Sequence, residues 1–286
     1  MISNKTKGVF WMLISVLGFT FMSIAIKYLP RIPTYEKVFF RNSVSLMLSA
    51  FILFKQKESI KVEKENIPFV FGRSFFGFVG MVANFYALEY LTMAEANMLN
   101  KLSPVFVTIC ACIFLKERVD KKQVIGIILM LLAVVFVIKP SFSPEIIPSL
   151  AGLFSAVLAG FSYTIIRYLN GKVKSEINVL YFSLLSVVCT FPLMMMNFVK
   201  PTLSEFFILL GGIGISAAIG QFGLTYAYTF APASEVSIYN YVIIITSMLM
   251  DYILFSTIPD LFSFIGGFII ISTAIYLYIH NKKKDN

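Results

Sequence analysis

The sequence predicts an all-α integral membrane protein with ten transmembrane helices. Of its 286 residues, 58% are hydrophobic and only 14% are charged, whereas soluble domains carry roughly 25% charged residues. The mean hydropathy is +0.83, and the apolar runs approach the ~20 residues that an α-helix needs to cross the hydrocarbon core. These runs lack the alternating pattern of barrel strands. We therefore expect helices throughout.

Charges and prolines separate the ten predicted spans, and the connections are too short to hold a separate soluble domain. The first span follows Lys5 and Lys7. It is too long for a signal peptide and no small-residue cleavage site follows it. The expected spans are 8–28, 35–54, 69–89, 92–114, 122–138, 149–169, 177–198, 206–228, 234–255 and 261–280.

Lysine and arginine residues are divided unevenly between the two sides of these helices. The loops on the side of both termini carry most of them, and loop cations concentrate on the cytoplasmic side of a membrane. We therefore expect a protein of the plasma (cytoplasmic) membrane with both termini in the cytoplasm. The net charge of +9 forms no basic patch interleaved with aromatic residues, so no nucleic-acid partner is expected. The opposite side receives few cations: Lys27, Arg31, Lys37, Lys139 and Lys200.

The two halves of the chain, 1–140 and 148–286, repeat each other, and each holds five predicted spans. Because five is an odd number, the second half is expected to enter the membrane inverted relative to the first. Many secondary transporters are built in this way, with their binding sites near the midplane between the repeats. A shift of 140 positions aligns Tyr86 with Tyr226, Glu95 with Glu235, Asn100 with Asn240, Asp120 with Asp260 and Gly126 with Gly266.

The fourth span is more polar than a membrane anchor requires. Asn97, Asn100 and Lys101 stand at positions i, i+3 and i+4, and Pro104 continues the same face at i+7. Lys101 lies about 14 Å from the outer start of the span, near the middle of a core about 30 Å thick. An intramembrane lysine normally faces the bundle interior or a water-filled cavity. This face predicts part of a substrate pathway, and the alternative is a kinked helix whose polar groups are satisfied by adjacent helices.

Cations and amides also occur inside the second and third spans. Arg73 and Asn84 share one face of the third span with two glycines, although Arg73 lies close enough to the cytoplasmic end to snorkel to lipid headgroups. Arg41, in the second span, is a candidate interior cation. An ion pair with Glu36 or Glu95 is its alternative explanation. We include Arg41, Arg73 and Asn84 among the candidate substrate-binding residues.

The second half adds Gln221, Tyr239 and Asn240 to the candidate substrate-binding residues. Asn240 is the repeat partner of Asn100, so a two-fold relation between the halves predicts that both asparagines converge on one central site. For the aromatic residues near Gln221 in the eighth span, Tyr226 and Tyr228, packing is the alternative, since aromatic side chains at helical spacing commonly pack in the core.

Glu95 and Glu235 are the repeat-related carboxylates near the membrane, one close to each face. As a hypothesis, they gate the pathway together with Pro104, or one of them carries a coupling proton. As the alternative, each caps its helix, since a carboxylate in the first turn is favoured by the helix dipole.

One stretch, from Tyr86 to Val119, reads YALEYLTMAEANMLNKLSPVFVTICACIFLKERV. Its Tyr-Ala start, Ala-Glu-Ala centre, Ser-Pro and Leu-x-Glu-Arg end, followed by Gly126, resemble the EamA-type family of the drug/metabolite transporter superfamily. The resemblance implies ten spans in two repeats and the transport of small compounds such as amino acids or nucleotide-like metabolites. The second half departs from the pattern, because Ile244 stands where Pro104 stands in the first.

These observations predict a secondary transporter or exporter that moves a small organic metabolite, amino-acid-like or anionic and amphipathic, by alternating access. Arg41, Arg73 and Lys101, set against few buried acids, favour a cargo with a carboxylate or a phosphate. An intramembrane lipid- or metabolite-modifying enzyme and a passive channel are the alternatives. The single histidine is His280, and the sequence has no metal-ligand cluster and no G-x-x-x-x-G-K-[ST] loop. We expect no enzyme, metal or cofactor, and leave open proton or ion coupling and the choice between monomer and homodimer.

Overall fold

The computed structural model describes residues 4–114, 120–138, 146–169, 171–230 and 236–285. These residues form helices and short connections, without strands. The helices are α1 (Asn4–Lys27), α2 (Thr34–Lys55), α3 (Ile67–Tyr90), α4 (Met93–Asn100), α5 (Ser103–Phe114), α6 (Lys121–Ile138), α7 (Ile146–Leu169), α8 (Ser175–Met196), α9 (Leu203–Phe207), the π-helix η1 (Ile208–Ile215), α10 (Ser216–Phe230), the 3₁₀-helix η2 (Ser237–Tyr241), α12 (Val242–Phe255) and α13 (Leu261–Asp285).

Within the described ranges, ten helical segments are long and apolar enough to cross a membrane. They confirm the predicted all-α membrane fold and lie within a few residues of the predicted spans. Three segments are composite: the fourth consists of α4 and α5, the eighth joins α9, η1 and α10, and the ninth joins η2 and α12.

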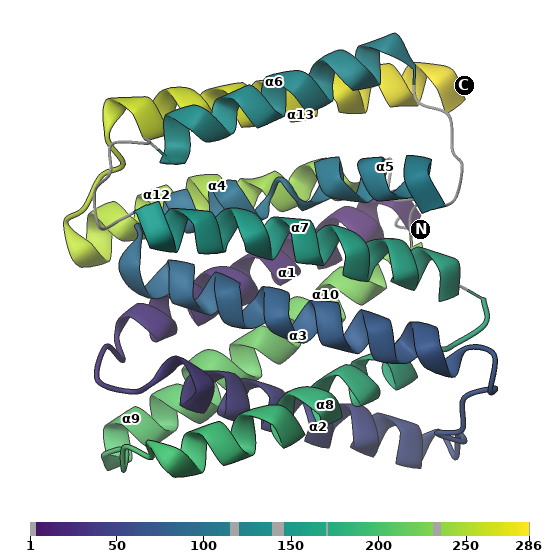
Figure 1. The fold of residues 1–286 in the computed structure, drawn as a ribbon, viewed down its shortest axis with the longest axis vertical. Coiled ribbons are helices and arrows are strands. Elements are labelled where there is room, and N and C mark those ends of the chain that lie inside the picture. Colours follow the sequence, from purple (N-terminus) through teal and green to yellow (C-terminus); the bar gives the residue numbers. More distant parts are fainter. Residues whose placement is uncertain (1–3, 115–119, 139–145, 170, 231–235, 286) are drawn as a thin grey trace.

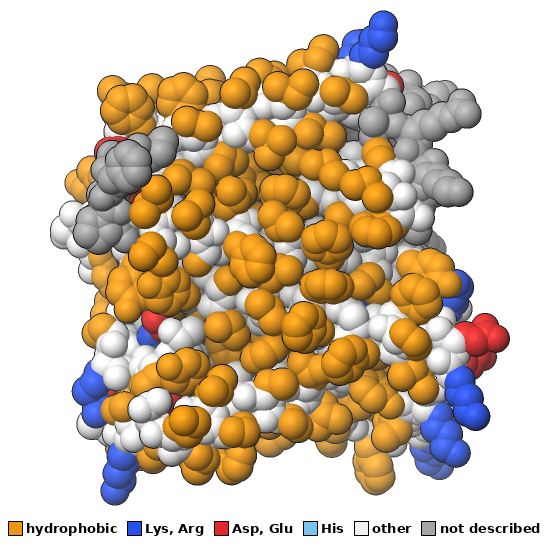
Figure 2. Space-filling model, viewed as in Figure 1, with side chains coloured by type: hydrophobic (Ala, Val, Ile, Leu, Met, Phe, Trp, Pro, Cys, Tyr) orange, Lys and Arg blue, Asp and Glu red, His pale blue; other side chains and the backbone are white. Residues whose placement is uncertain are grey.

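The long helices run side by side along one axis of the molecule, and both termini lie at the same end (Figure 1). We call this the terminal end and the other the opposite end. Figure 2 shows hydrophobic side chains covering the visible face between the two ends, whereas charged side chains gather at the ends. This is the distribution expected of a surface that faces lipid in the middle and water at both ends.

Each long helix packs on a partner that is distant in the sequence. Helix α1 packs on α10, α3 on α7, α2 on α8, and α6 on α13. Gly18 shows how close the first of these contacts is, because a Cβ atom added to it would lie 2.6 Å from the backbone nitrogen of Gly220. The Ser15 hydroxyl donates a hydrogen bond of 2.6 Å to the Gly220 carbonyl across the same contact. Small residues thus allow the two backbones to approach.

The fourth span is broken rather than continuous. Helix α4 ends at Asn100 and α5 begins at Ser103, so Lys101 lies in the break. Pro104 has no N–H to donate to the carbonyl of residue 100, which interrupts the helical hydrogen bonds at this point. The break separates the Lys101 backbone from the regular helix while keeping it within the bundle.

Candidate substrate cavity

A cavity of about 150 Å³ lies among the helices of both halves of the chain. This is several times the space that one water molecule requires, so the cavity has room for a small solute. Besides the predicted residues, Ser155, Ser162, Tyr163 and Phe182 contribute to its wall. Eight of the nine residues predicted to bind substrate line it: Arg41, Arg73, Asn84, Asn97, Asn100, Lys101, Gln221 and Asn240.

Two arginines share one aromatic ring in the wall of this cavity. The guanidinium carbon of Arg73 lies 4.2 Å from the Phe182 ring centroid, and that of Arg41 lies 5.5 Å from it. Both side chains are buried, with exposed fractions of 5% and 6%. We call Arg41 and Arg73 the arginine pair. Arg73 is thus packed inside the cavity wall rather than extended to the surface.

The arginine pair keeps unused hydrogen-bond donors. Arg41 Nη1 donates to Asn42 Oδ1 at 2.8 Å, which replaces the ion pair with Glu36 or Glu95 considered from the sequence. Among the described residues, Arg41 Nε, Arg73 Nε and Arg73 Nη1 have no hydrogen-bond partner. A buried donor without a partner costs about 1–3 kcal/mol, so an acceptor in the cavity would stabilise this arrangement.

The opposite wall of the cavity is built around the break in the fourth span. Lys101 Nζ donates to Asn240 Oδ1 at 3.1 Å, and Asn100 Nδ2 donates to Ser155 Oγ at 3.2 Å. The repeat-related asparagines therefore both line the cavity, each bonded to a different partner. Asn97, one turn earlier on α4, donates from Nδ2 to Ser247 Oγ at 2.9 Å.

The electrostatic character of the cavity is positive. Arg41, Arg73 and Lys101 line it, while none of the described lining residues is an aspartate or a glutamate. A buried charge is costly unless an opposite charge or hydrogen bonds compensate it. This wall therefore favours an anionic occupant.

Tyr239 and Pro104 do not line this cavity. Tyr239 packs beside a small apolar cluster of Met12, Ala227 and Val236. Pro104 lines a separate cavity between α5, α6 and α13. The effect of Pro104 in the structure is to break the fourth span next to Lys101.

The Glu95 carboxylate lies at the opposite end of the molecule, where it caps α4. Glu95 Oε2 accepts a hydrogen bond from the Thr92 backbone N–H at 3.3 Å, and the Thr92 hydroxyl accepts one from the Glu95 N–H at 3.1 Å. Glu95 Oε1 also accepts a bond of 2.6 Å from the Ser263 hydroxyl. These contacts are those of a helix cap. Glu235, its repeat partner, lies outside the described residues.

Asp251 is a structural residue whose role the sequence did not indicate. Although it stands near the end of its span, its side chain is fully buried. Its Oδ1 accepts from the Met93 N–H at 3.1 Å and its Oδ2 from the Ala94 N–H at 2.9 Å. A carboxylate of α12 thus caps the N-terminus of α4 and joins the two halves.

Lys37 is likewise buried, although it was counted among the loop cations. Its side chain is fully inaccessible, and Nζ donates to Glu89 Oε1 at 2.7 Å. The second carboxylate oxygen of Glu89 accepts a hydrogen bond from the Thr34 hydroxyl at 2.7 Å. This pair ties α2 to α3 at the opposite end.

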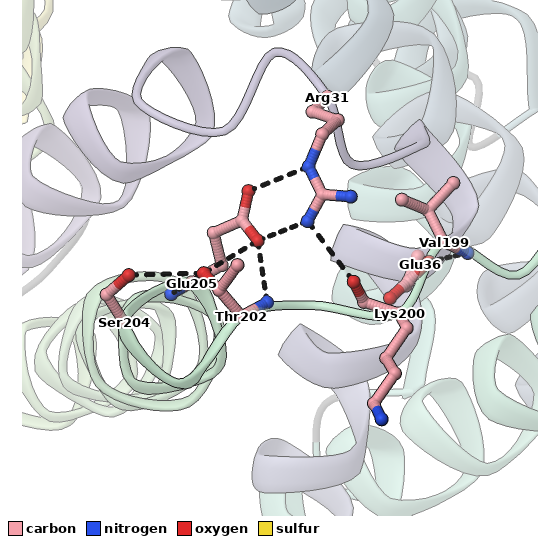
Figure 3. A network of polar contacts seen from close by, with 7 residues as sticks. All are labelled: Arg31, Glu36, Val199, Lys200, Thr202, Ser204 and Glu205. Atoms are coloured by element: carbon pink, nitrogen blue, oxygen red, sulfur yellow. Dashed lines mark hydrogen bonds and ion pairs between the residues drawn. The ribbon is translucent and has the colours of Figure 1, made fainter.

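A polar network at the same end joins the α1–α2 connection to the α8–α9 connection (Figure 3). Arg31 is bonded to both carboxylate oxygens of Glu205 and donates to the Lys200 carbonyl at 3.2 Å. The bond to Glu205 raises the pKa of the Arg31 guanidinium. Glu36 Oε2 accepts from the Val199 N–H at 3.3 Å.

The chain matches one family model, and several known proteins align with it along nearly their whole length. Residues 6–139 match the model of the EamA-like transporter family. A pseudopaline exporter of Pseudomonas aeruginosa is 29% identical over 273 residues, which cover 94% of this chain and 95% of the relative. An S-adenosylmethionine uptake transporter of Rickettsia conorii is 26% identical, with 98% and 95% covered. One crystal structure shares the fold with a TM-score of 0.64 at 18% identity, covering 95% of this chain and 94% of that one.

The ten membrane-spanning helices and the transporter relatives together define the class of protein: an integral membrane transporter of small molecules rather than an enzyme. Within this class, residues 6–139 match the EamA-like transporter family. The resemblance found in the stretch from Tyr86 to Val119 is thereby confirmed.

Proposed function

We propose that this protein is a secondary transporter that carries a small anionic organic metabolite by alternating access, with the cavity as its binding site. The carrying observation is the positive cavity wall, where Arg41, Arg73 and Lys101 meet amide side chains and no carboxylate among the described lining residues. Intramembrane cations that face a cavity mark substrate pathways in membrane proteins.

The helix pairing supports two inverted repeats, 1–140 and 148–286. If α7, α8 and α10 are the second-half equivalents of α1, α2 and α3, the contact of α1 with α10 is equivalent to that of α7 with α3. The α2–α8 and α6–α13 contacts map onto themselves under the same exchange. A pseudo-two-fold relation predicts this pattern, and it allows one repeat to rock against the other around a central site.

The distribution of basic residues supports cytoplasmic termini and a plasma-membrane location. Both termini lie at one end (Figure 1), and the 56–66 and 171–174 connections belong to this terminal end. They contribute lysines that include Lys57, Lys61, Lys64, Lys172 and Lys174. Loop lysines favour the cytoplasmic side.

Counterflow in proteoliposomes tests the proposal. A thermal-stability screen of the purified protein with carboxylates, phosphates and organic cations first selects a stabilising solute, which we expect to be anionic. Vesicles loaded with that unlabelled solute should then accumulate the labelled solute transiently. Conductance without exchange would indicate a channel, and stabilisation by cationic compounds alone would refute the anionic cargo.

The same vesicles can measure the direction of net transport and its coupling to protons. One relative is named as an exporter and another as an uptake transporter, so we leave the direction of net transport to this measurement. An imposed pH gradient that drives net accumulation would identify proton coupling. The molecular mass of the protein measured in detergent solution distinguishes a monomer from a homodimer.

A further inference from the structure

We propose that the cargo carries two separate negatively charged groups, one bound by the arginine pair over Phe182 and the other by Lys101. This inference rests on the proposed function and specifies the chemical class of its substrate. A dicarboxylate is the simplest molecule of this kind.

The arginine pair forms the first of the two anion subsites. Arg41 and Arg73 come from different helices, yet their guanidinium groups lie 5.5 and 4.2 Å from the centroid of the same Phe182 ring. Two like charges held over one ring in a buried place repel each other. An oxyanion held near the two guanidinium groups would offset this repulsion, and three of their nitrogens, Arg41 Nε, Arg73 Nε and Arg73 Nη1, have no partner among the described residues. The planar guanidinium group suits a carboxylate in particular.

Lys101 forms the second subsite. Its one described hydrogen bond goes to Asn240 Oδ1, whereas an ammonium group has three donors. Lys101 lines the same cavity as the arginine pair. It lies in the break between α4 and α5, where the chain leaves regular helix.

The two subsites belong to different walls. Arg41 and Phe182 come from α2 and α8, which form the bottom of Figure 1, whereas Lys101 follows α4 and Asn240 precedes α12, which lie nearer the top. A cargo that reaches both subsites therefore extends across the cavity. A phosphate monoester carries its two charges on one phosphorus and would occupy only one subsite at a time.

Charge compensation also favours two anionic groups. The described lining residues contribute three cations and no acid. A monoanion would leave two buried positive charges without a counter-charge, and a dianion would leave one. Because uncompensated charge is costly at low dielectric, the dianion is bound more tightly.

Thermal stabilisation of the full-length protein by matched acids tests this inference. Straight-chain dicarboxylates of increasing length are compared with monocarboxylates of the same length at pH 8, where both kinds are ionised. We expect one dicarboxylate length to bind at least about tenfold more tightly than its monocarboxylate, as for one added charge-assisted contact. In Lys101→Gln this advantage should vanish with the monocarboxylate unchanged, and in Arg73→Gln both acids should weaken.

Several results would overturn the inference. Equal binding of mono- and dicarboxylates, equal loss of both acids in Lys101→Gln, or tighter binding of a phosphate monoester than of every dicarboxylate would each do so. The wild-type comparison decides the question even if Lys101→Gln does not fold, and Lys101→Arg is the charge-preserving control. If the dicarboxylate pattern holds but no counterflow occurs, the proposed function fails and the binding inference stands. Counterflow with singly charged solutes only would mean that the proposed function stands and that the inference of two anionic groups fails.

Discussion

Replacing Asp251 by alanine is expected to destabilise the protein strongly, because its carboxylate caps α4 from another helix. The change removes the acceptors of the Met93 and Ala94 N–H groups, at 3.1 and 2.9 Å, at a site that is fully buried. A buried donor left unsatisfied costs about 1–3 kcal/mol, and loss of a single N-cap costs roughly 0.5–2 kcal/mol. For the two donors together we expect a loss of roughly 2–4 kcal/mol.

The measurement is the midpoint of thermal unfolding in detergent at a fixed scan rate. Since 1 kcal/mol corresponds to about 2–4 °C for chains somewhat shorter than this one, we expect a decrease of roughly 5–10 °C. Asp260→Ala is the matched control, because Asp260 Oδ1 accepts from the Ser263 N–H at 2.8 Å at an exposed position. This ordinary cap should cost about 1 kcal/mol. A loss in Asp251→Ala no larger than in the control would refute the reasoning.

Three further predictions concern packing, coupling and pH. Gly18→Ala should lower the unfolding midpoint, because the added Cβ would meet the backbone of α10 at 2.6 Å. Gly211→Ala is the control and should leave the midpoint unchanged, since nothing lies within 4 Å of the added Cβ. Equal effects of the two substitutions would contradict the close packing of α1 on α10. Glu95→Gln should leave the pH dependence of counterflow unchanged, because glutamine serves the same capping box, and a shifted profile would instead indicate coupling. Hydrogen bonds from a backbone N–H of α6 and from His280 lower the pKa of Asp120 to about 2. Its stabilisation is therefore present above the usual carboxyl pKa of about 3.9 and lost as the pH falls toward 2. The midpoint difference between wild type and Asp120→Asn should therefore shrink as the pH falls below about 4, and a difference that grows there would contradict this reasoning.

Local sequence patterns were sufficient for the spans and for many residues of the cavity. Hydropathy alone places the helices, because crossing the hydrocarbon core requires a long apolar run. Asn97, Asn100 and Lys101 were found because polar groups inside such a run are costly and their spacing puts them on one face. The structure places all three in the cavity wall.

Other features depend on contacts between distant helices and leave no local signal. Phe182 is one of many aromatic residues in apolar spans, and only the packing of α8 against α2 and α3 makes it the ring shared by the arginine pair. Nothing in the sequence around Asp251 indicates that it caps the N-terminus of α4. Pro104 indicates a disturbed helix, but the sequence does not distinguish a kink from the break seen at Lys101.

Counterflow by site variants tests most directly the claim that this cavity binds the transported solute. Wild type, Arg73→Gln, Lys101→Gln and Lys61→Gln, an exposed loop control, are reconstituted at equal amounts after their unfolding midpoints show that they are folded. With the anionic solute selected by the stability screen, we expect both cavity variants to lose at least about tenfold in exchange rate, as for loss of one charge-assisted contact, and the control to match wild type. Folded cavity variants that exchange the solute at the wild-type rate would contradict the account.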